Sequence, residues 1–232
     1  MIPIRQALRS SLGKKYVMGM SGLALVGFII MHLAGNLTLL DPSGITFNRY
    51  AKGIHDFGYL MTLGEFALLF LFLIHIYMAL TLKFNHSSAR NESYTQWKSK
   101  GIQTSNVSSR NMIVSGIVLL TFLILHIYQF RFSPGVEMGY GIDIDGETAK
   151  DLFRIVSETF MNPINVIIYV VVMLLLGLHI RHGFWSAFQS LGLMYPRWSS
   201  SIYCFGFILA ALLALGFIII PIYIYFNVGG LL

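Results

Sequence analysis

The sequence predicts an all-α integral membrane protein that crosses the bilayer with five transmembrane helices. Hydrophobic residues make up 56% of the 232 residues and charged residues only 11%, whereas a soluble domain carries about 25% charged residues. Five continuous apolar runs reach the length of about 17–25 residues that a spanning helix needs. The runs do not alternate between apolar and polar residues, as membrane strands do. Helices therefore account for the apolar runs.

We expect one membrane domain over residues 1–232, which is the simplest interpretation of the length. The expected helices cover residues 17–40, 63–82, 112–130, 163–188 and 202–226. Basic residues precede the first run, which is also the pattern of a signal peptide. That run is longer than a signal peptide and carries a histidine and an asparagine, so we interpret it as a helix of the protein. The single cysteine, Cys204, excludes a cysteine-ligated cluster built from this chain alone.

The distribution of basic residues predicts the orientation, since lysine and arginine favour the cytoplasmic side. The N-terminal tail and the second and fourth loops share one side, which carries Arg5, Arg9, Lys14, Lys15, Lys83, Arg90, Lys98, Lys100, Arg110, Arg181 and Arg197. The other side carries only Arg49, Lys52, Arg131, Lys150 and Arg154. The N-terminus is therefore expected inside and the C-terminus outside. The net charge of +6 then belongs to the cytoplasmic loops, and no nucleic-acid partner is expected.

The third loop is acidic and is expected to contain a short amphipathic helix. Leu152, Phe153, Val156 and Phe160 recur in it at helical spacing. The pair Asn162-Pro163 fits the start of the fourth helix, because proline is tolerated where the backbone N–H has no helical partner.

Four of the seven histidines lie within predicted spans, one in each of the first four helices: His32, His75, His126 and His179. Ionisable residues inside a membrane are costly and indicate a functional site. A single intramembrane histidine is as well explained by a hydrogen bond to a neighbouring helix. Four histidines in four separate helices favour a shared function.

The depths of the histidines predict two pairs. His32 and His126 lie fifteen and fourteen residues from the inner ends of their helices, roughly 22 Å at 1.5 Å per residue. His75 and His179 lie in the inner half of helices that run the opposite way. Two facing imidazoles at one level suit a six-coordinate haem iron in a helix bundle. Structural zinc is a weaker alternative, because it usually takes four ligands at one level.

The sequence resembles the single-chain, di-haem cytochrome b membrane anchor of succinate dehydrogenase and fumarate reductase. The resemblance covers most of the chain, and its segments are SLGKKYVMGMSGL, HLAGNL, FNRYAKGIHDF, HIYMALTLK, LHIYQF and NPINVIIYVVVMLLLGLHIRHGFWSAFQSLG. The last segment is the most specific. The resemblance implies haem ligation by His32 with His126 (outer haem) and by His75 with His179 (inner haem).

The same resemblance implies the function and the partners of the chain. Such an anchor binds two haem b groups in a bacterial-type cytoplasmic membrane. It docks an iron–sulfur subunit and an FAD-containing flavoprotein on the cytoplasmic side. Electrons then pass between succinate or fumarate at the flavin and a membrane quinone, either menaquinone or ubiquinone. The dicarboxylate active site is not expected here, because the chain lacks a dinucleotide fingerprint and a set of cluster cysteines.

Three further residues are candidates for the site. Arg181 and His182 directly follow the ligand segment of helix four, and each could bind a haem propionate; a snorkelling arginine at a helix end is the alternative for Arg181. Glu65 precedes His75 by ten residues, roughly 15 Å outward, and could exchange protons with a quinone. A carboxylate stabilised by a helix N-terminus is the structural alternative.

Two other functions are compatible with intramembrane histidines. Other membrane di-haem cytochromes, which serve formate dehydrogenases, hydrogenases or ascorbate-dependent transfer, share the bundle but not the segment HGFWSAFQSLG. A transporter or proton channel could use the histidines as a relay. Transporters often contain internal repeats or helices broken at the midplane, and we detect no repeat in this sequence.

Overall fold

The computed structural model of the protein describes residues 6, 10–88 and 112–228, with side chains left undescribed at 85–88. Several basic residues used to predict the orientation lie outside the described residues: Arg5, Arg9, Arg90, Lys98, Lys100 and Arg110. The predicted orientation therefore stays a prediction.

Within the described part of the chain, five helices are long and apolar enough to cross a membrane, which confirms the five predicted spans. They are α2 (Ser11–Asn36), α4 (Tyr59–Ser88), α6 (Met112–Phe130), α8 (Pro163–Ser190) and α9 (Ser199–Asn227). The chain is thus a multi-pass membrane protein of the all-α class. Helix α6 has the predicted bounds, and α4, α8 and α9 extend beyond theirs by one to six residues at an end. Helix α2 begins six residues before the predicted start and ends at Asn36, after which Leu37–Leu40 form the 3-10 helix η1.

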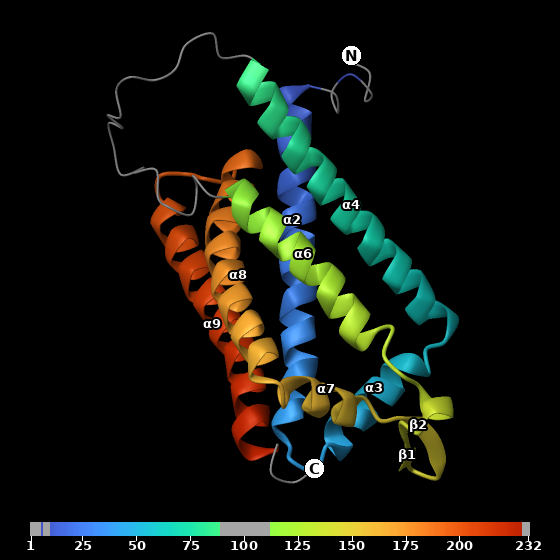
Figure 1. Cartoon of the computed structure of the whole chain (residues 1–232). Helices are drawn as coiled ribbons and strands as arrows, with labels where there is room; N and C mark the ends of the chain where they lie inside the picture. Colours follow the sequence, from blue (N-terminus) through green and yellow to red (C-terminus); the bar gives the residue numbers. More distant parts are fainter. Residues whose placement is uncertain (1–5, 7–9, 89–111, 229–232) are drawn as a thin grey trace.

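The helices run alternately up and down between two ends of the molecule (Figure 1). We call the end where α2, α6 and α9 begin and where α4 and α8 end the upper end. The opposite, lower end holds the short elements: η1 (Leu37–Leu40), α3 (Ile45–His55), η2 (Val136–Met138), β1 (Gly141–Ile144), β2 (Glu147–Lys150) and α7 (Leu152–Phe160). In the predicted orientation, the lower end is the outer one.

The amphipathic helix predicted in the third loop is confirmed as α7, which covers Leu152–Phe160. Asp151 caps it by accepting a hydrogen bond from the backbone N–H of Arg154. Its apolar face, including Phe153, Val156 and Phe160, is buried in a cluster with residues of η1, α3, α8 and α9. The predicted start of the fourth span is also confirmed, since Asn162 caps α8 and Pro163 is its first residue.

The antiparallel hairpin of β1 and β2 and the helix α3 were not predicted. The turn of the hairpin is Asp145-Gly146, and both residues have positive φ angles of 59° and 85°. Asp-Gly at the tip of a two-residue turn is a strong hairpin signal. Ion pairs from Arg49 to Asp145 and from Lys52 to Glu147 tie α3 to this hairpin, so that α3, the hairpin and α7 form one cap below the helices.

Small residues bring α9 close to α8 and keep it on the outside of the bundle. A Cβ atom on Gly177 would lie 2.9 Å from the Cβ atom of Ala214, so the two helices approach backbone to backbone. Close contacts of this kind drive helix association in membranes, where the hydrophobic effect does not. Residues of α2, α4, α6 and α8 line one cavity, and Phe217, Ile220 and Pro221 of α9 also contribute to its wall.

Candidate cofactor site

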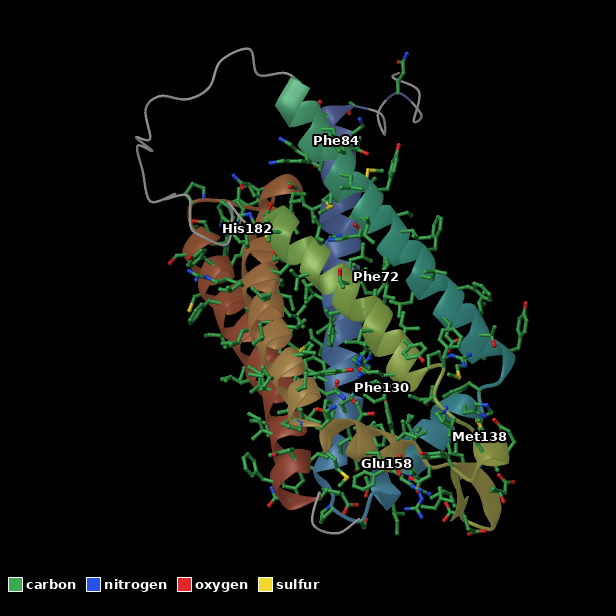
Figure 2. The ribbon with its side chains drawn as sticks, in the orientation of Figure 1. Phe72, Phe84, Phe130, Met138, Glu158 and His182 are labelled. Atoms are coloured by element: carbon green, nitrogen blue, oxygen red, sulfur yellow. The ribbon has the colours of Figure 1, made fainter. Side chains whose placement is uncertain are left out.

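A cavity of about 2670 Å³ lies between α2, α4, α6 and α8. Its lining is mainly apolar, with residues such as Leu25, Phe72 and Phe130, of which the latter two are labelled in Figure 2. All four predicted histidines line it, one from each helix. Drug-sized ligands occupy pockets of about 300–1,000 Å³, so this cavity has room for more than one large group.

The structure brings His32 and His126 together near the lower end. Both lie four residues before the end of their helices. Their ring centroids are 5.7 Å apart, and the rings are nearly perpendicular at 87°. Phe28 and Phe122, each one turn before its histidine, contact the two rings at 5.4 and 5.7 Å. Aromatic contacts therefore help to fix the orientation of both imidazoles.

A chain of hydrogen bonds connects His126 to the cap. Its Nδ1 atom lies 3.3 Å from the hydroxyl of Tyr169, which donates to Oε1 of Gln129 over 2.7 Å. Nε2 of Gln129 donates to Oδ1 of Asn165 over 3.4 Å, and Nδ2 of Asn165 donates to the carbonyl of Thr159 over 2.8 Å. The orientation of His126 is thus coupled to the backbone of α7.

His75 and His179 lie nearer the upper end, and each contacts a serine of the adjacent helix. Nδ1 of His75 lies 3.3 Å from Oγ of Ser21, and Nδ1 of His179 lies 3.0 Å from Oγ of Ser115. Ser21 precedes His32 by eleven residues on α2, so the two histidine levels are separated by roughly 16 Å along the helix axis.

Glycines provide room beside both of these histidines. A Cβ atom on Gly22 would lie 3.4 Å from Cε1 of His75, and a Cβ atom on Gly116 would lie 3.7 Å from Cε1 of His179. A larger side chain at either position would contact the imidazole ring. The missing side chains therefore keep the space next to each ring open for a flat ligand.

Charged and polar groups line the cavity at its two ends. At the lower end, Arg131 forms an ion pair with Glu65, with N–O distances of 2.8 and 3.1 Å. These hydrogen bonds raise the pKa of the Arg131 guanidinium. At the upper end, Lys15, Lys83 and His182 line the cavity, and Figure 2 labels His182 near the top of α8. Anionic groups of a ligand would find a cation at either end.

Arg181 is directed toward α9 and is not among the residues that line the cavity. Its guanidinium donates a hydrogen bond of 2.6 Å to the hydroxyl of Tyr203 and lies 5.3 Å from the ring centroid of Phe207. His182, the next residue, lines the cavity instead. Successive residues of a helix are rotated by about 100° around its axis, so the side chains of Arg181 and His182 point in different directions.

Among the described residues, no three histidine, cysteine or carboxylate side chains converge on a point that could hold a metal ion. The donor set is therefore two histidines at each of two levels, and it suits axial ligation better than a tetrahedral zinc site. Sequence reasoning missed Ser21, Tyr169, Gln129 and the pairing of Glu65 with Arg131. A signal for Ser21 exists, since a Ser-Gly pair precedes a histidine by eleven residues in both α2 and α6.

Comparison with protein-family models, curated proteins and solved structures finds no match.

Proposed function

We propose that this chain is the membrane anchor and electron-transfer subunit of a succinate:quinone oxidoreductase, with two haem b groups in the central cavity. Haem, when bound, supplies reversible one-electron transfer. His32 and His126 would hold one iron, and His75 and His179 the other. A membrane quinone would exchange electrons with the site, while an iron–sulfur subunit and an FAD-containing flavoprotein would dock on the cytoplasmic side.

The observation that carries this proposal is the placement of four histidines from four helices around one apolar cavity, at two levels. A histidine nitrogen binds its metal at about 2 Å. The ring centroids of His32 and His126 are 5.7 Å apart, so both imidazoles could hold one iron between them. A relay of single histidines along a transport path does not require two rings to face each other.

The ends of the cavity also suit an amphiphilic macrocycle. Haem carries two carboxylates on one edge, and these need cationic or hydrogen-bonding partners when they leave water. Lys15, Lys83 and His182 line the upper end, whereas Arg131 at the lower end is already paired with Glu65. Between them the lining is apolar, which keeps water from the metal site and favours the electron-transfer role of haem over reactions with solvent.

The functional experiment is a haem count on the purified chain, by a pyridine haemochrome assay and a reduced-minus-oxidised spectrum. We expect about two b-type haems per chain with low-spin spectra. One haem would mean that one histidine pair is structural and would contradict the di-haem proposal. Well-folded protein without haem would overturn the redox function and favour the transporter or proton channel.

The assignment to succinate is tested separately from haem binding. The chain, tagged and purified in mild detergent from the membranes of its own cells, should retain a flavoprotein and an iron–sulfur protein and should reduce a quinone with succinate. A di-haem chain that instead retains the subunits of a formate dehydrogenase or a hydrogenase would keep the cytochrome proposal and refute the succinate assignment.

A further inference from the structure

Three of the four predicted haem-ligand histidines have the same kind of neighbour at Nδ1, namely a hydroxyl group from an adjacent helix. Ser21 of α2 faces His75 of α4, and Ser115 of α6 faces His179 of α8, at 3.3 and 3.0 Å. Tyr169 of α8 faces His126 of α6 at 3.3 Å. In each contact, either the hydroxyl or Nδ1 of the histidine donates the proton.

Proton counting indicates the donor in the contacts of the two serines. A serine hydroxyl has one proton to donate. Ser21 donates it to the carbonyl of Met18 over 3.1 Å, and Ser115 donates it to the carbonyl of Met112 over 3.0 Å. Both contacts of each serine oxygen are hydrogen bonds at the same time only if the serine donates to the carbonyl and accepts from Nδ1 of its histidine. The geometry therefore favours the neutral imidazole that carries its proton on Nδ1.

The direction of the hydrogen bond between His126 and Tyr169 follows from a chain of hydrogen bonds that ends at a backbone carbonyl. The carbonyl of Thr159 can only accept, so Asn165 points Nδ2 toward it and Oδ1 toward Nε2 of Gln129. That orientation leaves Oε1 of Gln129 to accept the proton of the Tyr169 hydroxyl. Nδ1 of His126 must then donate to Tyr169.

We propose that Ser21, Ser115 and Tyr169 are positioning residues that hold the protons of His75, His179 and His126 on Nδ1 and so leave the Nε2 lone pair of each imidazole for a metal. The inference rests on the proposed haem function and adds the groups that orient the ligands. Hydrogen bonds from the second nitrogen of a histidine ligand fix its tautomer and raise its basicity. A more basic axial ligand stabilises the oxidised iron and lowers the reduction potential.

A short residue pattern shared by α2 and α6 supports this role for the serines. Residues 21–32 (SGLALVGFIIMH) and 115–126 (SGIVLLTFLILH) share serine, glycine, phenylalanine and histidine at matching positions. The serine of the first segment contacts His75 of α4, and the serine of the second segment contacts His179 of α8. The glycine after the serine lies beside the same imidazole ring. The Ser-Gly pair thus recurs wherever an upper-level histidine is placed.

The lower level lacks this symmetry. Tyr169 precedes His179 by ten residues, and the residue ten before His75 is Glu65. Glu65 pairs with Arg131. Within the described part of the chain, the polar neighbour of the His32 ring nitrogens is Nδ2 of Asn36, at 3.4 Å from both. That amide nitrogen donates to the carbonyl of His32 at 2.8 Å and cannot accept a proton. The two levels should therefore respond to different variants.

The test is a redox titration of both haems, with low-spin EPR spectra, in Ser21→Ala, Ser115→Ala and Tyr169→Phe. Ser21→Ala and Ser115→Ala should each raise the midpoint potential of the haem held by His75 and His179. Tyr169→Phe should raise the midpoint potential of the haem held by His32 and His126. Ser21→Thr and Ser115→Thr, which keep the hydroxyl, should restore the potential. Thr121→Ala on α6 is the control, because its exposed hydroxyl donates only to the carbonyl of Ile117.

Unchanged potentials in both alanine variants, with both haems retained, would overturn the inference while leaving the proposed function intact. If an alanine variant loses one haem selectively, restoration by the threonine variant supports the inference. If the threonine variant also loses that haem, the cause is the changed size of the side chain and not the missing hydroxyl, and the inference is overturned. A wild-type chain without haem would instead refute the proposed function, before any variant is compared.

Discussion

Arg131, the first residue after α6, donates two hydrogen bonds of 2.8 and 3.1 Å to the carboxylate of Glu65 on α4. The pair lines the lower end of the cavity and joins two helices that otherwise pack on different neighbours. Because its side chains are 59% and 38% exposed, such a pair is worth at most about 1 kcal/mol. The pair therefore contributes little to the free energy of unfolding.

Glu65→Gln should lower quinone turnover while both haems and the thermal stability are retained. The amide keeps the size of the side chain but cannot exchange a proton with a quinone. Turnover and haem content are measured in the same preparation, with Glu147→Gln as the control, since Glu147 is an exposed carboxylate of the cap. Unchanged turnover would remove Glu65 from the mechanism.

Single histidine variants should reveal the pairing of the ligands. His32→Ala and His126→Ala should remove the same haem, because their rings face each other, and His75→Ala and His179→Ala should remove the other. The two haems are distinguished by their potentials and EPR signals. His55→Ala, at the end of α3, should keep both haems. Loss of different haems from the two members of a pair would contradict the pairing.

Asn48→Ala should destabilise the cap by about 1–3 kcal/mol, the cost of leaving a buried hydrogen-bonding group without its partner. Asn48 is 1% exposed, donates to Asp151 and accepts from the backbone N–H of Phe153. It therefore joins α3 to the start of α7. Thermal unfolding in detergent measures the effect. The exposed Asn227 at the end of α9 provides a control, and equal losses in both alanine variants would refute a specific role for Asn48.

Asp41 should make the stability of the cap depend on acid pH. Hydrogen bonds from Thr46 and Ser43 lower the pKa of Asp41 from 3.8 to about 2. The folded state therefore favours the carboxylate, so the contribution is complete above pH 3.8 and is lost as the pH falls toward 2. Unfolding midpoints between pH 5 and 2 should decline less in Asp41→Asn than in the wild type. Parallel curves would contradict this assignment.

The hydropathy pattern was sufficient to predict the five spans, because a chain in lipid must satisfy its backbone hydrogen bonds within helices. The regular helical rise also placed His32 and His126 at one level before any contact was known. The hairpin was missed although Asp145-Gly146 carries its signal. The surrounding acidic residues predict a loop, and the ion pairs that hold the hairpin to Arg49 and Lys52 join residues distant in sequence.

Side-chain partners could not be predicted in the same way. Whether Arg181 or His182 faces the cavity depends on the rotation of α8 about its axis, which the contacts with α9 set. The pattern shared by residues 21–32 and 115–126 does not by itself indicate a function. Its role depends on the contacts that each serine makes with a histidine of another helix. The chain sequence thus carries the number of helices, their lengths and the depth of each histidine, all of which follow from local hydrogen bonding and helical rise. The packing of α2 with α4 and of α6 with α8 supplies the rest: which nitrogen of each imidazole is held by a hydroxyl and which side chains meet across the cavity.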